Sequence, residues 1–301
     1  MTRADRFRMV TGGAGLLAPL ALVLILVVLL QQAWPAIIRF GPGFLTNQIW
    51  DQVRLQFGAL PYIYGTVVTA ALALLIAVPV GVGVALFLAE PGQAGVRGVI
   101  GTAVELLAAI PSVVYGLWAL FVMGPWVFKA FEVPISHRLT WIPLFGGTPR
   151  PTSLFTAALI LAVMVLPTLA SVSRDVIRSV PGGLREASVA LGATWWELTW
   201  RVILPAARAG IFGASILALG RALGETIAVT MIIGNRNQIS VHLFEPAYTL
   251  AAVIANEFTE ATAPMHTAAL IELGAVLIAV TLTVNLLALG LLRITSRDQK
   301  A

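Results

Sequence analysis

Residues 220–226 read Gly-Arg-Ala-Leu-Gly-Glu-Thr and interrupt an otherwise apolar run from Ala209 to Gly234. A run of that length can cross the roughly 30 Å hydrocarbon core of a bilayer as one helix. Such a helix would place Arg221 and Glu225 on one face, where they can form an ion pair. Because a charge near the bilayer centre costs about 3 kcal/mol or more, neither side chain is expected to face lipid. We interpret the pair as lining a pathway for an anion; a purely structural ion pair between helices is the alternative.

The composition of the whole chain is that of a membrane protein. Of its 301 residues 58% are hydrophobic and 11% are charged, and the mean hydropathy is +0.92. The net charge of +5 does not indicate a nucleic-acid partner, because the arginines are scattered at the ends of apolar runs. The chain has no cysteine, and His137, His242 and His266 lack ligand spacing, so we expect neither a metal site nor a cofactor in this chain.

Six apolar runs predict an all-α membrane protein with six transmembrane helices. These runs are Val10–Leu30, Pro61–Ala89, Val99–Val127, Ser153–Val172, Ala209–Gly234 and Met265–Leu292. We expect external loops at Pro35–Leu60, Phe128–Thr152 and Asn235–Pro264, and a long cytoplasmic loop at Arg174–Arg208. Twelve arginine and lysine residues fall on the side of the termini and of residues 174–208, against six on the other side. The excess of positive charge predicts that both termini are cytoplasmic.

The same pattern suggests how the chain is divided. Residues 1–60 would form an N-terminal transmembrane helix and the first external loop. Residues 61–301 would form a core of five transmembrane helices that carries the cytoplasmic loop 174–208.

The loop 174–208 carries the most specific pattern in the sequence, which predicts two short helices at an angle. Gly192 can adopt the left-handed conformation that ends the first helix. Thr194 and Glu197 form a capping-box pattern that starts the second, and Pro205 marks its end or a junction. An amphipathic hairpin at the membrane surface would account for this geometry but not for the residue spacing.

That spacing resembles the EAA motif of ABC importer permeases. The resemblance lies in Glu186-Ala187-Ser188, in Gly192 four residues later, and in Leu204-Pro205, with Val202 where isoleucine is more usual. In that family the element is a coupling helix that inserts into a cleft of a cytoplasmic ATPase. The resemblance implies the type I importer permease (MetI-like) fold in a bacterial inner membrane, and a coupling role for Glu186, Ala187, Ser188, Gly192, Leu204 and Pro205.

Two further stretches are similar to the C-type permeases of phosphate-specific ABC importers. These are Glu105–Trp118 and Gly220–Thr226, and the likeness covers most of the chain from about Pro61 onward. In that family an arginine and a glutamate of this span are associated with phosphate passage, which maps onto Arg221 and Glu225. A guanidinium offers a planar fork of donors suited to phosphate oxygens. Our hypothesis is that the anion competes with Glu225 for Arg221.

The energy source is expected to lie in another subunit. A nucleotide-binding P-loop needs a Gly-Lys-Ser/Thr core, which neither Lys129 nor Lys300 provides. We therefore expect a transport subunit rather than an enzyme, with ATP bound by a cytoplasmic ATPase dimer. As an importer permease it would also need a second, A-type permease, an extracytoplasmic phosphate-binding protein and surrounding membrane lipid. One alternative is a permease of this class for sulfate or molybdate. A second is a secondary anion transporter, which the absence of a visible internal repeat argues against.

Five other polar side chains are weaker candidates. Glu105 is expected to be solvated near the headgroups, and Glu257 and Glu260 to lie on a solvated external face. Glu272 and Asn285 fall inside the sixth span, where interhelical hydrogen bonding is the expected role and lining of the pathway is the alternative.

Overall fold

The computed structural model describes residues 3–89 and 94–297, which form helices joined by short connections. Six helical stretches in this part of the chain are long and apolar enough to cross a membrane, which confirms the predicted all-α membrane fold. They are Gly15–Phe40, Leu60–Ala89, Ser112–Arg138, Leu154–Arg178, Trp195–Leu223 and Pro264–Leu292.

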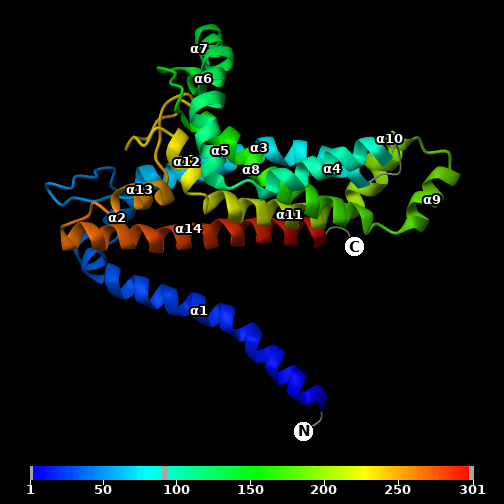
Figure 1. Ribbon diagram of the computed structural model, residues 1–301, viewed down its shortest axis with the longest axis horizontal. Coiled ribbons are helices and arrows are strands. Elements are labelled where there is room, and N and C mark those ends of the chain that lie inside the picture. The colour runs from blue at the N-terminus through cyan, green and yellow to red at the C-terminus, as the bar shows by residue number, and fades with distance from the viewer. Residues whose placement is uncertain (1–2, 90–93, 298–301) are drawn as a thin grey trace.

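Four long helices lie side by side along the long axis of the molecule (Figure 1), namely α3 (Leu60–Ala89), α8 (Leu154–Arg178), α11 (Leu204–Leu223) and α14 (Pro264–Arg297). A fifth helix, α1 (Arg3–Phe40), packs on α14 and diverges from it towards its own N-terminal end (Figure 1). The helices α9 (Gly182–Ala190) and α10 (Trp195–Glu197) lie at one end of the bundle, and α2 (Gly43–Thr46) and α13 (Leu250–Glu257) at the other.

The ends of α1 and α14 bear on the predicted topology. Helix α1 begins, and α14 ends, towards the end of the bundle that carries α9 and α10 (Figure 1). This arrangement is the one expected if the loop 174–208 and both termini share one side of the membrane. Residues 1–2 and 298–301 lie outside the described residues, and which side is cytoplasmic stays a prediction.

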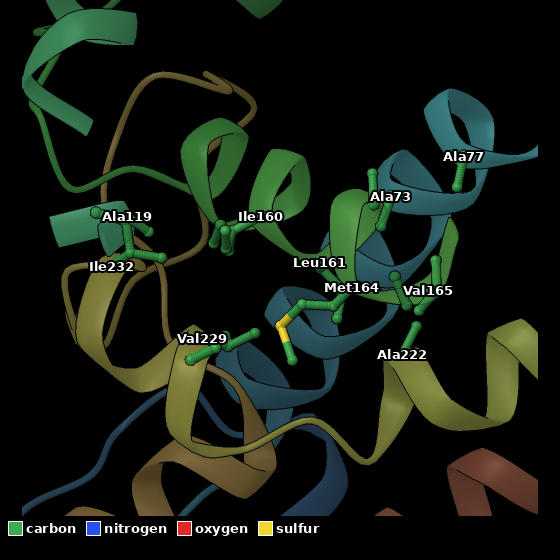
Figure 2. Packing of buried hydrophobic residues seen from close by; sticks show 14 of the residues in the cluster. Ala73, Ala77, Ala119, Ile160, Leu161, Met164, Val165, Ala222, Val229 and Ile232 are labelled. Carbon is green, nitrogen blue, oxygen red and sulfur yellow. The ribbon is translucent and has the colours of Figure 1, made fainter. Parts of the chain in front are cut away.

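Helix α3 packs against α8 through a row of small residues. The buried members of this row are Ala70, Ala73, Ala77, Gly81 and Ala85. Small residues let two backbones approach closely, which is how helices gain van der Waals contact in lipid. A methyl group at Gly81, for example, would overlap the Leu169 side chain of α8. Figure 2 shows Ala73 and Ala77 in the same hydrophobic cluster as Val165 of α8.

The third span differs from the predicted Val99–Val127, because the helix is broken at Pro111. Helix α4 (Ala94–Ala109) ends before Pro111, which is extended (φ −60°, ψ 145°), and α5 (Ser112–Trp118) begins after it. Proline lacks an N–H and disfavours helix in the residue before it. The helix then continues through two π-helical stretches and α6 (Gly124–Val127) to the end of α7 (Val133–Arg138). Much of the predicted loop Phe128–Thr152 is therefore helical, and α5–α7 turn away from the bundle (Figure 1).

Two other predicted boundaries are also wrong. The first span was expected to end at Leu30, but α1 runs on to Phe40 with Pro35 inside it. The predicted external loop Asn235–Pro264 contains α13, which starts where the Thr249 hydroxyl accepts a hydrogen bond from the Ala252 N–H (3.3 Å). A capping residue of this kind satisfies one of the N–H groups left free at the start of a helix.

The segment after α1 is held to the C-terminal helices by the half-buried carboxylate of Glu257. The Glu257 Oε2 atom accepts hydrogen bonds from Trp50 Nε1 (2.8 Å) and Gln52 Nε2 (2.9 Å), and lies 3.1 Å from His266 Nε2. Its side chain is only 15% exposed, so the prediction of a solvated external position for Glu257 is wrong. The error arises because two of its three partners, Trp50 and Gln52, lie more than 200 residues earlier in the chain. Glu260 is exposed, as predicted.

We expect Gly65→Ala to destabilise the contact between α3 and the segment before α13. A methyl group there would overlap the backbone carbonyl oxygen of Tyr248, which cannot move independently of its chain. Overpacking of this kind costs about 1–3 kcal/mol, so the thermal unfolding temperature of the purified complex should fall. Gly274→Ala in α14 is the matched control, because no atom lies within 4 Å of the new methyl group. Equal unfolding temperatures for the two variants would contradict this packing.

Candidate functional site

The predicted fifth span is interrupted at the residues that were singled out in it. Helix α11 ends at Leu223, and α12 (Ile227–Ile232) begins after a connection made by residues 224–226. Gly224 serves as the C-cap of α11, with its N–H hydrogen-bonded to the Gly220 carbonyl. The membrane-spanning helix in this region is Trp195–Leu223 rather than Ala209–Gly234.

The break separates Arg221 from Glu225, so the predicted stacking of the two on one helical face is wrong. Arg221 lies in the last turn of α11 and is exposed, whereas Glu225 lies in the connection. Among the described residues no ion pair joins them. Instead, Glu225 Oε1 accepts a hydrogen bond from the Ala228 N–H (3.4 Å) in the first turn of α12. The carboxylate thus satisfies a backbone donor at the start of α12, a favourable place for negative charge.

The Arg221 side chain lies close to the other broken span. Its guanidinium is within electrostatic range of the Tyr115 hydroxyl, and that hydroxyl donates a hydrogen bond to the Leu107 carbonyl (2.7 Å). Helix α12 packs on α5, where a methyl group at Gly116 would overlap Met231 and press on Ala228. The structure therefore brings together Glu105–Trp118 and Gly220–Thr226, the two stretches that carry the resemblance to phosphate importers.

The connection between α11 and α12 runs beside a buried hydrophobic cluster, with Gly224 exposed and Glu225 and Thr226 half-buried. Figure 2 shows Ala222 at the end of α11 and Val229 in α12 on either side of the non-helical segment, with Met164 of α8 pointing towards Val229. All three of these side chains are buried in one hydrophobic cluster. Non-helical backbone at membrane depth is tolerated only where it is buried in protein or lines a water-filled cavity. One side of the break is thus covered by the buried cluster, and Arg221 is exposed beside it.

Glu272 and Asn285, the candidates in the sixth span, lie at different positions along α14. Asn285 approaches the site, since its Nδ2 atom would lie 3.7 Å from a methyl group at Gly220. Glu272 is 7% exposed and borders an apolar cavity of about 560 Å³ between α1, α3 and α14. It precedes Asn285 by thirteen residues, or about 20 Å along the helix. Glu272 Oε2 and Asn285 Oδ1 are buried without a hydrogen-bond partner in the described structure, so the expected interhelical hydrogen bonds are not formed by these atoms.

Glu132 is a buried carboxyl that no sequence pattern singled out. It was expected in an external loop, but it is 0% exposed and its Oε1 accepts hydrogen bonds from the hydroxyls of Ser153 (2.6 Å) and Thr156 (3.0 Å). Ser153 is also the N-cap of α8, accepting from the Thr156 N–H. Glu132 therefore fixes the connection between α7 and α8. Its partners lie over twenty residues away along the chain, so no local pattern could reveal it.

The segment that carries the predicted coupling residues has the predicted helix ends. Helix α9 ends at Ala190 and is followed by Gly192, whose φ of +83° is left-handed; the Gly192 and Ala193 N–H groups bond to the Val189 and Ser188 carbonyls. This pair of bonds is the Schellman motif. Helix α10 starts with the predicted capping box between Thr194 and Glu197, and Pro205 lies at the junction where a π-helical turn, Leu198–Ile203, meets α11.

The six predicted coupling residues are exposed or half-buried, and none is fully buried. Glu186, Ala187 and Gly192 are exposed, while Ser188, Leu204 and Pro205 are half-buried. Leu191, the C-cap of α9, is 90% exposed, so a large apolar side chain is left uncovered there. Arg185 anchors the base of α9 by donating from Nη2 to the Ile177 carbonyl (2.8 Å). The segment is thus a fixed projection with an uncovered apolar face, which is typical of a docking element.

Comparison with known proteins identifies the family. Residues 78–300 match the family described as "Binding-protein-dependent transport system inner membrane component". The chain is 46% identical to the "Phosphate transport system permease protein PstC" of Mesorhizobium japonicum over 97% of this chain and 90% of that protein. It is 44% identical to the protein of the same name from Haemophilus influenzae over 97% of this chain and 93% of the relative.

The fold comparison agrees with this assignment. A permease chain from the crystal structure of a bacterial alginate ABC transporter superposes with a TM-score of 0.63, covering 95% of this chain and 94% of the other at 20% identity. At that identity the likeness concerns the fold alone. The protein is a multi-pass membrane protein, and the chain belongs to the family of binding-protein-dependent transport system inner membrane components.

Proposed function

We propose that this chain is the permease subunit of an ATP-driven importer of inorganic phosphate and forms half of its translocation pathway. The observation that carries the proposal is the identity of 46% and 44%, over 97% of the chain, to two proteins named as phosphate transport permeases. The exposed Arg221 at the meeting point of two broken spans supports it, because a guanidinium suits the oxygens of a tetrahedral anion. The chain is a transport subunit, and no step of covalent chemistry is assigned to it.

The proposed partners follow from surfaces that this chain leaves uncovered. The α9 projection would dock into a cytoplasmic ATPase dimer, which binds the ATP that this chain has no P-loop to hold. A second, A-type permease would face Arg221 and complete the pathway. An extracytoplasmic phosphate-binding protein would deliver the anion at the end formed by α2 and α13.

In the proposed pathway Arg221 holds the anion and Glu225 borders it. Glu225 is hydrogen-bonded to the first turn of α12, so in this arrangement an anion can reach Arg221 without displacing Glu225, and competition between the two for Arg221 stays a hypothesis. At neutral pH inorganic phosphate keeps at least one P–OH hydrogen, which a carboxylate can accept, whereas sulfate has none. An ionised carboxylate offers acceptors only, so Glu225 would favour phosphate over sulfate.

We expect Glu225→Gln to lower phosphate uptake and to let sulfate compete better. Glutamine retains a carbonyl acceptor for the Ala228 N–H, so α12 should stay intact while the charge is lost. The measurement is radiolabelled phosphate uptake with increasing sulfate, in cells that lack their own phosphate importers. Glu260→Gln, at an exposed external carboxylate, is the matched control.

The same assay tests the choice of substrate. Uptake of phosphate that sulfate and molybdate do not inhibit in the wild-type protein is the expected result. Preferential uptake of sulfate or molybdate would assign the permease to another oxyanion and remove the proposed role of Glu225.

A further inference from the structure

Two cavities adjoin each other at the end of the bundle that carries α10. The first, of about 740 Å³, lies between α3, α10 with its π-helical turn, and the start of α11, and we call it the tryptophan groove. Its lining is almost wholly apolar and includes Val82, Leu86, Phe87, Trp196 and Trp200. The second, of about 340 Å³, lies between the end of α3, α4 and α8, and we call it the arginine pocket. Its charged lining consists of Arg97, Glu105, Arg174 and Arg178.

Arg97 lines both cavities and so joins them. Its guanidinium lies 5.9 Å from the centre of the Phe87 ring, which is part of the groove. The tryptophans of the groove form a contiguous set, with ring centroids of Trp195 and Trp196 at 5.9 Å and of Trp196 and Trp200 at 5.7 Å. A single ligand can therefore occupy a charged compartment and an apolar compartment at once.

The arginine pocket has an excess of positive charge. Two carboxylates lie near its three guanidinium groups: Glu105 in the lining, and Asp175, whose Oδ1 is 3.4 Å from Arg174 Nε. Arg178 donates from Nη2 to the Leu88 carbonyl (2.8 Å), which fixes it in the wall. Each guanidinium carries five N–H donors, so most of the donors of these arginines are left for a ligand. Several guanidinium groups converging on one space suit a phosphate oxygen cluster.

The place of the two cavities fits the surface of a membrane leaflet. Tryptophan is enriched at the level of the lipid headgroups. Basic pockets between transmembrane helices on the cytoplasmic side suit anionic headgroups, because that leaflet is rich in anionic lipid. Helices α4 and α10 lie beside each other at the end of the bundle that carries the arginine-rich loop 174–208 (Figure 1).

We propose that this site binds an anionic phospholipid of the cytoplasmic leaflet. Its phosphate lies between Arg97 and Arg174, and one acyl chain lies in the tryptophan groove. Free inorganic phosphate would use the arginine pocket alone and would gain nothing from the groove. A protein segment would need partners for its backbone groups, which the apolar groove does not supply. The inference does not depend on which anion the permease transports.

The test measures the phospholipid retained by the purified complex. The complex is exchanged into detergent with phosphatidylglycerol or phosphatidylcholine, and bound lipid is counted by native mass spectrometry. Wild-type protein should retain phosphatidylglycerol in preference to phosphatidylcholine. Arg97→Gln should weaken retention about fivefold, and Arg97→Gln combined with Arg174→Gln about 30-fold, as expected for about 1 kcal/mol per arginine near an anionic headgroup. Arg201→Gln is the matched control, since Arg201 is 79% exposed and lines neither cavity.

A second variant tests the groove separately from the charge. Gly83 lines the groove, and no atom lies within 4 Å of a β-carbon placed there, so Gly83→Leu directs an apolar side chain into the groove. It should reduce phosphatidylglycerol retention as strongly as Arg97→Gln does. Equal retention of both lipids, or unchanged retention in Gly83→Leu, would overturn the proposal. Displacement of the lipid by inorganic phosphate, or cross-linking of the groove to another subunit, would also overturn it.

Discussion

Replacing Arg221 by glutamine is expected to reduce phosphate uptake at least about 100-fold while the complex still assembles. Hydrogen bonds to charged groups contribute about 1.5–3 kcal/mol each, and a guanidinium can make two to one phosphate. Arg221 is exposed in the last turn of α11 and supports no ion pair to Glu225 in the described structure, so its loss should leave the helix intact. The measurement is radiolabelled phosphate uptake per amount of complex recovered from the membrane.

Two variants separate the role of Arg221 from a general effect of charge. Arg39→Gln removes a guanidinium from the exposed end of α1 and should transport normally. Arg221→Lys keeps the charge but loses the planar fork of donors, and should be intermediate. Normal uptake by a well-assembled Arg221→Gln complex would remove Arg221 from the pathway.

Gly192→Val is expected to uncouple ATP hydrolysis from transport. The φ of +83° at this position is left-handed, which costs a residue other than glycine about 1–2 kcal/mol. No atom lies within 4 Å of a β-carbon placed there, so the expected effect comes from the backbone conformation. Relief of the strain would turn α9 relative to α10, and we expect retention of the ATPase and phosphate uptake to fall about 5- to 30-fold.

The matched variant at the same position is Gly192→Asn. Asparagine tolerates the left-handed region, so α9 should keep its direction and coupling should be nearly normal. Glu186→Gln, on the exposed face of α9, should weaken ATPase binding without changing the helix. If Gly192→Val bound the ATPase and transported like Gly192→Asn, the coupling role of this segment would be wrong.

The features that the sequence predicted well depend on local rules. The six spans follow from the length of apolar runs, and the turn at Gly192 and the capping box at Thr194 follow from the preferences of single residues at helix ends. Each of these signals needs only a few neighbouring residues. These local signals therefore hold regardless of how the rest of the chain packs.

The features that the sequence did not predict depend on packing between distant segments. Apolar residues continue on both sides of Gly224 and of Pro111, so hydropathy alone reads each broken span as one helix. The break after Leu223 is stabilised by α12 packing on α5, which is about a hundred residues earlier in the chain. The separation of Arg221 from Glu225 follows from that tertiary contact and could not be read from their spacing.

The most direct test of the central claim is phosphate uptake into proteoliposomes. These would contain the purified complex of this chain, its partner permease and the ATPase subunits, with the binding protein added on the opposite face. The account predicts that phosphate accumulates only when ATP is present on the ATPase side and the binding protein on the other, and that Arg221→Gln abolishes accumulation. Phosphate uptake by this chain without the ATPase, driven by an ion gradient, would contradict it.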